Sequence, residues 1–531
     1  MKPADGSLSS ATPGLIRISL RERWSAVPFQ ITVGAILVLA AALRLWHLGA
    51  KPLWFDETWS VFIARQRLEE IPRLLRLYDH LPPLHYLILN IWIALFSTAE
   101  AAVRLPSVLA GIGAVGVTFL LADRVAGRRV AFLASVLLAI SPFQIAAAQE
   151  ARTYSFVTLF GLGAAYGVWR AVEDGKWRYW LLYAGCLLLA LYTHHFSFLL
   201  VPAFGVFVLS GRETRRAWWR WLAWTAGAGV LYLPWLPALL AQLVSARTWP
   251  EIRPAFDAYF LTDLFGLFSF GGQLFGLGSY YRRGALPLEY RPAVLLPFLF
   301  LVIAGIWGLR DRRARAFLLT YWAIPIVIAA TISVQWHLFF ERYFSFVLPP
   351  FVILMAAGIV ALQDAARPNA RRHIVVVLFV YVLSFNTSSL AAHYSAAPTA
   401  DWRAVGRHLT TVAEPQDFVL FLPAFTRVPL EYYFQGPQAR MGLNPREIPE
   451  GPGRVGRRRF TLRLEVNPQQ LKNVARGHPR MWVVTALGLG TDLRAQLTTS
   501  LAPYFRRSDV RAFGQVEITL WESMAYRPVG R

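Results

Sequence analysis

Two adjacent carboxylates, Asp56 and Glu57, are the residues of this chain best suited to acid–base chemistry. They stand in the run LWFDETWS, residues 53–60, directly after the first long apolar segment. Ionised groups at the end of a membrane span are costly unless they bind a metal ion, form an ion pair or take part in a reaction. A carboxylate beside a hydroxyl group can remove its proton as a new bond forms. The structural alternative is a solvated turn, or the N-cap of a helix that starts near Thr58.

Other ionisable and aromatic residues stand at the ends of further apolar segments, on the side that we predict to be external. They are Asp79, His80 and His85; Gln149, Glu150, Arg152 and Tyr154; His194 and His195; and Glu341, Arg342 and Tyr343. Because a plain helical bundle does not require so many charged ends, we expect these groups to converge on one cavity. Arginines and a histidine there could stabilise the negative charge that grows on a phosphate leaving group.

Each of these groups also has a structural alternative that the sequence leaves open. The pair Asp79-His80 can be a loop before a helix that starts at two prolines. The two histidines at 194 and 195 can be interfacial residues that snorkel. The two arginines can form ion pairs with the neighbouring Glu150 and Glu341, and aromatic residues near span ends are typical of an interfacial belt.

The composition is that of a multi-span membrane protein. Of the 531 residues, 56% are hydrophobic, and the mean hydropathy is +0.41. We expect about eleven runs to cross a hydrocarbon core of about 30 Å: 27–48, 104–122, 130–147, 154–170, 179–193, 196–210, 219–240, 293–309, 316–334, 344–362 and 373–390. A further run, 83–98, is expected to be embedded without crossing. Residues 58–66 and 67–78 are expected to form amphipathic helices at the interface.

The positive charge of the chain follows this topology. The formal net charge is +23, and because Lys occurs only at positions 2, 51, 176 and 472, nearly all of it is Arg. Much of it lies in short loops that the positive-inside rule makes cytoplasmic, together with residues 1–26. The charge therefore gives no reason to expect a nucleic-acid partner. The single Cys186 offers no disulfide framework and no zinc-ligand spacing.

From about residue 395 the pattern changes from long apolar runs to alternating helices and strands. Helical patterns at 401–412 and 493–504 alternate with strand-like runs at 418–422, 481–485 and 516–521. We therefore predict an α-helical membrane domain over 27–394, with its first external loop at 49–82. An external (periplasmic) α/β domain of ordinary size is predicted over 395–531.

Several short motifs together resemble the membrane glycosyltransferases of the GT-C superfamily. The specific resemblance is to bacterial relatives of the protein O-mannosyltransferases (glycosyltransferase family 39) and of the lipid A aminoarabinose transferase. The motifs are PLWFDETWS at 52–60, HLPPLHY at 80–86, RLPS at 104–107, SP at 141–142, QEARTY at 149–154, YTHH at 192–195 and ERY at 341–343. No single motif is diagnostic, but their order and spacing are specific and cover the membrane portion.

The resemblance implies a GT-C fold and an inverting transfer of a single hexose or pentose. The donor would be a polyprenyl-phosphate sugar, and the acceptor a hydroxyl of a glycan, lipid or protein on the external face of a bacterial inner membrane. Asp56 maps to the proposed catalytic base, and Glu57 would orient the acceptor or the base. The donor phosphate would be held by Arg152, His194, Arg342 and Tyr343, although relatives carry a basic residue where His194 stands.

The remaining candidates would contact substrate or close the site: Asp79, His80, Glu150, Tyr154 and His195. Asp79 maps to a position where relatives could bind a metal, so Asp79 and His80 are candidates for an optional divalent ion. No other cofactor is expected. The absence of an Asp-X-Asp pair near 149–154 argues against a lipid-linked oligosaccharide donor.

Two other classes of function remain open on the sequence. A transporter or lipid flippase would carry ionisable residues near the middle of its spans and inverted repeats, and neither is evident here. A non-catalytic membrane scaffold would leave Asp56, Arg152 and Arg342 far apart, whereas a cavity for a sugar phosphate would hold them together.

Overall fold

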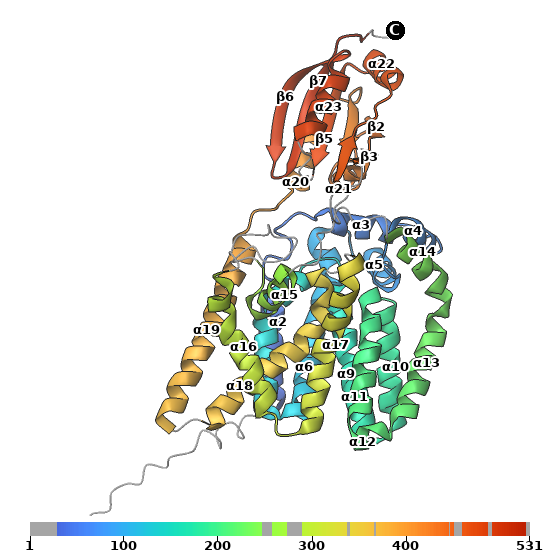
Figure 1. The fold of residues 1–531 in the computed structure, drawn as a ribbon. Coiled ribbons are helices and arrows are strands. Elements are labelled where there is room, and N and C mark those ends of the chain that lie inside the picture. The colour runs from blue at the N-terminus through green and yellow to red at the C-terminus, as the bar shows by residue number, and fades with distance from the viewer. Residues whose placement is uncertain are drawn as a thin grey trace, which may run out of the picture.

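A bundle of long helices with an α/β domain at one end makes up this computed structural model (Figure 1). It describes residues 29–246, 258–272, 289–336, 340–365, 368–444, 446–450, 459–486 and 491–526. The segment 1–26, predicted to be cytoplasmic, lies outside these residues. The mostly helical membrane region followed by a small sheet domain confirms the predicted fold class.

The membrane region is helical because hydrocarbon leaves no partner for backbone groups except those within a helix. After α2 (Phe29–Leu45), two short helices, α3 (Phe55–Ala64) and α4 (Ile71–Tyr78), lie across the end of the bundle. The other elements are α5 (Leu84–Leu95), α6 (Glu100–Ala126), α7 (Arg128–Ile140), α8 (Pro142–Ala148), α9 (Tyr154–Asp174), α10 (Trp177–Leu191), η1 (His195–Leu199), α11 (Leu200–Ser210), α12 (Arg212–Arg215), α13 (Trp218–Tyr232), η2 (Leu233–Trp235), α14 (Leu236–Ala246), α15 (Ala258–Phe270), α16 (Arg291–Gly308), α17 (Arg312–Trp336), η3 (Glu341–Val347), α18 (Leu348–Ala365) and α19 (Pro368–Ser395).

The predicted spans all have helical counterparts. Among the described residues, seven helical segments are long and apolar enough to cross a membrane, and the bent pair α7–α8 makes an eighth. Shorter apolar helices at 30–45, 177–191 and 195–210 occupy the other predicted spans. The segment expected not to cross forms α5, whose 12 residues reach only about 18 Å, short of a core of about 30 Å.

Two details differ from the sequence expectation. The predicted single span 130–147 is bent by 59° between α7 and α8. The bend arises because Pro142 has no backbone N–H to donate. Ser141 then caps a new helix, since its side chain accepts a hydrogen bond from Gln144 N at 3.4 Å. The helix α15 appears where we expected only a loop. Its 13 residues are too few to be recognised as a span from hydropathy.

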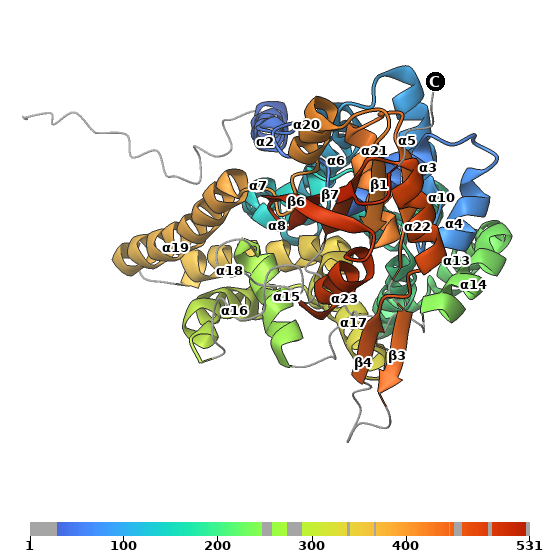
Figure 2. The ribbon, with the colours of Figure 1, turned by 90° about the horizontal axis from the view of Figure 1, so that it is seen from above.

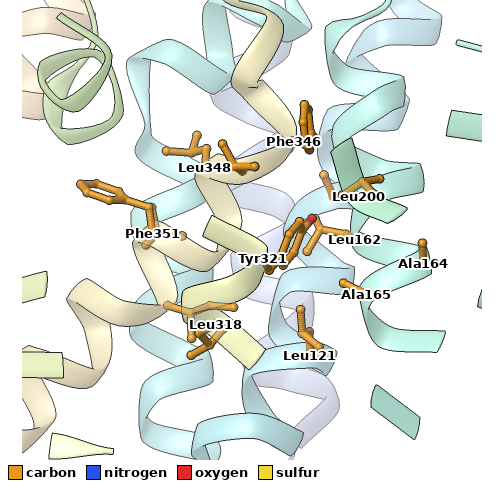
Figure 3. Packing of buried hydrophobic residues seen from close by; sticks show 14 of the residues in the cluster. Leu121, Leu162, Ala164, Ala165, Leu200, Leu318, Tyr321, Phe346, Leu348 and Phe351 are labelled. Carbon is orange, nitrogen blue, oxygen red and sulfur yellow. The ribbon is translucent and has the colours of Figure 1, made fainter. Parts of the chain in front are cut away.

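Close helix packing holds the bundle together. In the core of the bundle, Leu318 and Tyr321 of α17 pack among side chains of α6, α9, α11 and α18 (Figure 3). Two glycines allow α16 and α18 to touch through their backbones. A Cβ on Gly305 would meet Leu354 O at 1.9 Å, and one on Gly358 would meet Leu301 O at 2.0 Å. Small residues serve membrane helices in this way because lipid supplies no hydrophobic force between them.

The C-terminal domain contains a five-stranded sheet in the order β2-β1-β5-β7-β6. Strands β1, β2 and β5 are parallel, whereas β7 is antiparallel to both β5 and β6. A separate hairpin pairs β3 with β4. The elements are α20 (Trp402–Val412), β1 (Phe418–Leu422), η4 (Ala424–Thr426), α21 (Arg427–Tyr433), β2 (Ala439–Gly442), β3 (Arg446–Glu450), β4 (Arg459–Arg463), α22 (Pro468–Gly477), β5 (Arg480–Ala486), α23 (Thr491–Leu501), β6 (Phe505–Phe513) and β7 (Val516–Ser523).

This domain sits on the end of the bundle that carries α3. Viewed from above, α20 and α21 lie over the region of α3, α5 and α6 (Figure 2). Phe425 of η4 packs against Phe55 of α3, with ring centroids 5.0 Å apart. The C-terminal domain is thus in direct contact with the helix that carries the two candidate carboxylates.

Candidate functional site

The two carboxylates lie in the first turn of α3. The helix begins at Phe55 with Trp54 as its N-cap residue, so it starts earlier than the sequence alternative placed it, and neither carboxylate is the cap. Unpaired N–H groups and the helix dipole stabilise negative charge at this position. Glu57 uses one of these groups, since its Oε2 accepts from Trp54 N at 3.3 Å.

Glu57 is held in a buried clamp with Arg104 of α6. Its side chain is fully buried, and Arg104 donates from Nε to Oε1 and from Nη2 to Oε2, each at 2.7 Å. Ala151 N donates to the same Oε1 at 2.9 Å. Arg104 also donates to the backbone oxygens of Leu48, Lys51 and Pro52. A two-pronged Arg–carboxylate pair fixes position as well as charge, so the clamp ties α3 to α6 and to the loop before α9.

Asp56 points to a different set of partners. Its Oδ2 lies 3.1 Å from Arg342 Nη2 and 3.8 Å from Arg152 Nη2. Arg152 Nη1 donates to the backbone oxygen of Asp56 at 3.3 Å and to Ser60 Oγ at 3.2 Å. The Asp56 side chain keeps 20% of its surface exposed, whereas that of Glu57 keeps none. Of the two carboxylates, only Asp56 is therefore open to a substrate.

Aromatic rings surround the guanidinium group of Arg342. It lies 5.2 Å from the ring centroid of Trp54, 5.5 Å from that of Tyr154 and 5.0 Å from that of Phe340. A cation over ring faces is held electrostatically, and more strongly where water is excluded. This arrangement positions Arg342 beside Asp56 while leaving it able to attract a second anion.

Three buried polar atoms next to Asp56 and Arg342 have no hydrogen-bond partner in the described structure: Arg152 Nε, Tyr154 Oη and His194 Nε2. Tyr154 and His194 are neighbours, with ring centroids 6.3 Å apart, and Tyr343 packs against both, at 6.4 Å and 4.8 Å. Buried polar atoms are nearly always paired. The cluster therefore has hydrogen-bonding capacity that ligand oxygens could use.

The tautomer of His194 follows from its surroundings. Its Nδ1 accepts a hydrogen bond from Phe196 N at 3.2 Å, so the neutral ring carries its proton on Nε2. Burial, followed by the nearby His195, Arg152 and Arg342, lowers the pKa of His194 well below its usual value. We expected His194 to help neutralise the phosphate charge. A neutral His194 carries no charge for that purpose, but its Nε2–H can donate a hydrogen bond to a phosphate oxygen.

Glu150 is a carboxyl group whose pKa lies close to neutral pH. Burial raises the pKa of Glu150 to about 7, and the charges of Glu57 and Asp56 act in the same direction. Arg342 and Arg152 oppose this shift. The sequence alternative paired Arg152 with Glu150, whereas in the structure Arg152 pairs with Asp56.

Asp79 is engaged by the protein itself. Its Oδ2 accepts from Trp59 Nε1 at 3.0 Å and from Tyr86 Oη at 2.6 Å, and its Oδ1 accepts from His80 N at 2.6 Å. These contacts hold the end of α4 against α3 and α5. Both carboxylate oxygens of Asp79 therefore already accept hydrogen bonds from the protein. Among the residues that the structure describes, no group of three or more His, Cys, Asp or Glu could hold a metal ion.

His195 and His85 also have structural partners. His195 Nε2 lies 2.8 Å from Gln242 Oε1, and Gln242 donates to the backbone oxygens of Leu75 and Asp79. His85 Nε2 lies 3.1 Å from Ala151 O. The structure thus brings Asp56, Arg152 and Arg342 together with a wall of aromatic and histidine side chains: Tyr154, His194 and Tyr343. Asp79, His80 and His195 brace the elements around this cluster.

Sequence reasoning missed two sets of residues around the site. Arg104 appeared only within a motif, although an arginine at the start of an apolar run signals a buried partner. The second set joins the C-terminal domain to the first loop. Tyr433 Oη accepts from Leu53 N at 2.7 Å and donates to Glu100 Oε1 at 2.9 Å, and Arg403 donates to the same Oε1 at 2.8 Å. No local pattern could have revealed contacts across several hundred residues.

Comparisons with known proteins place this geometry in context. Residues 80–244 match the family described as dolichyl-phosphate-mannose-protein mannosyltransferase. YkcB of Bacillus subtilis, named as a candidate mannosyltransferase, is 30% identical over 130 residues, which are 24% of this chain and 18% of that protein. The chain thus spans less than a fifth of the length of this curated relative.

Solved structures match over nearly the whole chain. ArnT from Cupriavidus metallidurans bound to undecaprenyl phosphate has a TM-score of 0.56 and 15% identity, and the match covers 94% of this chain and all of that one. The oligosaccharyltransferase AglB from Archaeoglobus fulgidus, in complex with an inhibitory peptide and a dolichol-phosphate, has a TM-score of 0.54 and 13% identity, with coverages of 95% and 76%. The chain therefore has the GT-C fold of these membrane glycosyltransferases, and residues 80–244 carry the sequence signature of the dolichyl-phosphate-mannose-protein mannosyltransferase family.

Proposed function

We propose that this protein is an inverting membrane glycosyltransferase that moves one hexose or pentose from a polyprenyl-phosphate donor to an acceptor hydroxyl. The observation that carries the proposal is the placement of Asp56. It is a partly exposed carboxylate at 3.1 Å and 3.8 Å from two arginines, beside three buried polar atoms that lack partners. This places a base next to groups that suit a phosphate.

The proposed reaction uses the two halves of the cluster at the same time. Asp56 accepts the proton of the acceptor hydroxyl while the acceptor oxygen bonds to the anomeric carbon of the donor sugar. The bond between that carbon and the phosphate oxygen breaks, so the configuration inverts. The electron pair of the broken bond stays on the polyprenyl phosphate, whose charge grows. Preorganised cations and hydrogen-bond donors are most effective where charge develops.

The leaving phosphate would be stabilised by Arg152 and Arg342. Tyr154 Oη and His194 Nε2 would donate hydrogen bonds to its oxygens, with Tyr343 packed beside both rings. In the absence of donor, both arginines are near Asp56, and an incoming phosphodiester gives them a second anion. Tyr343 and Glu150 would shape the pocket rather than react.

Glu57 would act through Asp56 and not on the acceptor. Its carboxylate has no exposed surface and is bonded to Arg104, Ala151 and Trp54. Of the two roles considered for it, orienting the base fits this geometry. No step of the proposed reaction requires a metal, and Asp79 and His80 stay the candidates for an optional divalent ion.

Two comparisons support the donor and the location. The solved structures of ArnT and AglB hold undecaprenyl phosphate and dolichol-phosphate, which favours a polyprenyl-phosphate donor here. We propose that the active site and the C-terminal domain face the external side of a bacterial inner membrane. The Arg-rich loops at the opposite end of the bundle support that orientation by the positive-inside rule.

The test measures release of polyprenyl phosphate from a panel of polyprenyl-phosphate monosaccharides by purified protein in lipid nanodiscs, with a total membrane extract added as the source of acceptor hydroxyls. Asp56→Asn should lower turnover by about 100-fold or more, the usual contribution of a general base. The matched control is Asp123→Asn, which removes an acid at the opposite end of the bundle and should leave turnover unchanged. Full activity of Asp56→Asn would refute the assignment of the base.

A further inference from the structure

A second feature lies at the end of the bundle away from the candidate site. It is a surface hollow of about 700 Å³ lined by Gly175, Lys176, Trp177, Arg178, Trp180, Arg220 and Trp224. The hollow is formed where α9 ends and where α10 and α13 begin. All three helices extend to the side of the bundle opposite the C-terminal domain (Figure 1).

The hollow is positively charged. Lys176, Arg178 and Arg220 are exposed and line it, and no acidic residue is among its lining residues. The acids that precede the hollow in the sequence, Glu173 and Asp174, are engaged by Arg170, at 3.3 Å for Glu173, and the charge of Asp174 also acts on Lys176. The N-terminus of α10 adds its own unpaired N–H groups and positive dipole end. An anion in the hollow would therefore meet several donors and little repulsion.

A buried donor without a partner also lines the hollow. Trp180 is only 1% exposed, and its indole Nε1 has no hydrogen-bond partner in the described structure. Since an indole N–H can only donate, an oxygen atom entering the hollow is the partner that it requires. Trp177 is 68% exposed beside it. Indole rings with one wet and one apolar side are typical of the headgroup level of a membrane.

The position of the hollow along the helices gives the nature of the anion. One membrane-crossing segment ends at Asp174 and another begins at Trp218, so the hollow lies at a membrane boundary. One turn further into the bundle, Leu181, Leu182 and Leu222 are exposed, which gives acyl chains an apolar surface. We propose that this hollow binds the phosphodiester headgroup of an anionic phospholipid. The site is separate from the proposed transfer reaction.

The experiment counts bound lipid by native mass spectrometry of the full chain in detergent, with added dioleoylphosphatidylglycerol. The test variant is Lys176→Gln with Arg178→Gln and Arg220→Gln. The matched control is Arg212→Gln with Arg310→Gln and Arg312→Gln, which removes three exposed arginines from the same end of the bundle outside the hollow. Each basic residue near an anionic headgroup changes affinity roughly fivefold, so the test variant should bind on the order of 100-fold more weakly.

A second variant guards against misfolding of the first. Trp180→Phe keeps an aromatic ring but removes the N–H, and should weaken retention by roughly fivefold. Dioleoylphosphatidylcholine should bind weakly to all forms, and inorganic phosphate should not displace phosphatidylglycerol. Equal losses in the test and control variants would overturn the proposal. So would displacement by inorganic phosphate, which would indicate a free-anion site instead of a lipid site.

Discussion

The clamp between Glu57 and Arg104 gives the sharpest prediction about how the site is held. Both side chains are buried, with exposures of 0% and 5%, and the two hydrogen bonds between them are each 2.7 Å. Glu57→Gln keeps the shape of the side chain but removes its charge. Removing one partner of a buried pair leaves the other charge uncompensated and costs about 3–5 kcal/mol.

The structure argues for the upper part of that range. Arg104 would keep its three backbone acceptors, Leu48 O, Lys51 O and Pro52 O, but its charge would lose the only carboxylate described in contact with it. The free energy of unfolding can be followed by SDS titration in mixed micelles. The control pair Arg128–Asp123 has exposures of 56% and 27%, and Asp123→Asn should cost at most about 1 kcal/mol.

A double variant separates charge from shape. Glu57→Leu with Arg104→Met replaces the pair by apolar side chains, and should recover part of the stability lost by Glu57→Leu alone, because no unpaired charge remains. Recovery should be incomplete, since the three backbone oxygens lose their donor. Glu57→Gln should also lower turnover by about 100-fold through misplacement of Asp56. Unchanged stability of Glu57→Gln, or strictly additive losses in the double variant, would refute the clamp.

Three further predictions follow from the site and its contacts. The raised pKa of Glu150, from 4.5 to about 7, means that the folded state keeps a proton that the unfolded state has released. Stability should therefore fall by about 3 kcal/mol as the pH rises from 4.5 to 7 and stay level above it, and Glu150→Gln should abolish this slope in denaturation curves taken across that range. His194→Phe should lower kcat by roughly tenfold through loss of one hydrogen bond to a charged group. The activity of the native enzyme should show no titration of His194 between about pH 6 and 8, because the pKa of His194 is lowered. An inflection in that range that disappears in His194→Phe would contradict a neutral His194. Tyr433→Phe removes the acceptor of Leu53 N and should lower the free energy of unfolding by about 1–3 kcal/mol. It should also lower kcat more than it changes KM. The control Tyr504→Phe, on the far side of the C-terminal domain, should leave both kinetic constants unchanged.

The membrane fold was largely predictable because its cause is local. Runs such as 104–122 and 293–309 are apolar along their whole length, and a helix is the only way for such a run to pair its backbone in lipid. The expectation that 83–98 is embedded without crossing came from the side on which the later Arg-rich loops must lie. Hydropathy, however, does not indicate where a helix bends or which segments it contacts. The bend between α7 and α8 and the short helix α15 depend on which neighbours each segment packs against.

The C-terminal domain was predictable in part for the same reason. Strands β1, β5 and β7 lie in the centre of the sheet, and each was expected: β1 and β5 are mostly apolar runs, and β7 alternates apolar and polar residues. Strands β2 and β6 lie at the edges, where alternate or irregular burial weakens the pattern. The helix α21 was missed because its apolar face is short, although its Tyr433 bonds to Leu53 of the first loop and its Tyr432 bonds to Thr98 before α6.

The sequence by itself determined which residues could react and at which ends of the apolar segments they stand, because charged groups beside membrane spans are costly and therefore conspicuous. It left open whether Glu57 orients the acceptor or the base. Only the tertiary structure gave the two carboxylates different surroundings, by placing Arg104 against Glu57 and two arginines from distant segments beside Asp56. The physical reason is that the state and role of a carboxylate depend on the charges and solvent within a few ångströms of it, and those neighbours come from segments that the chain brings together only when it folds.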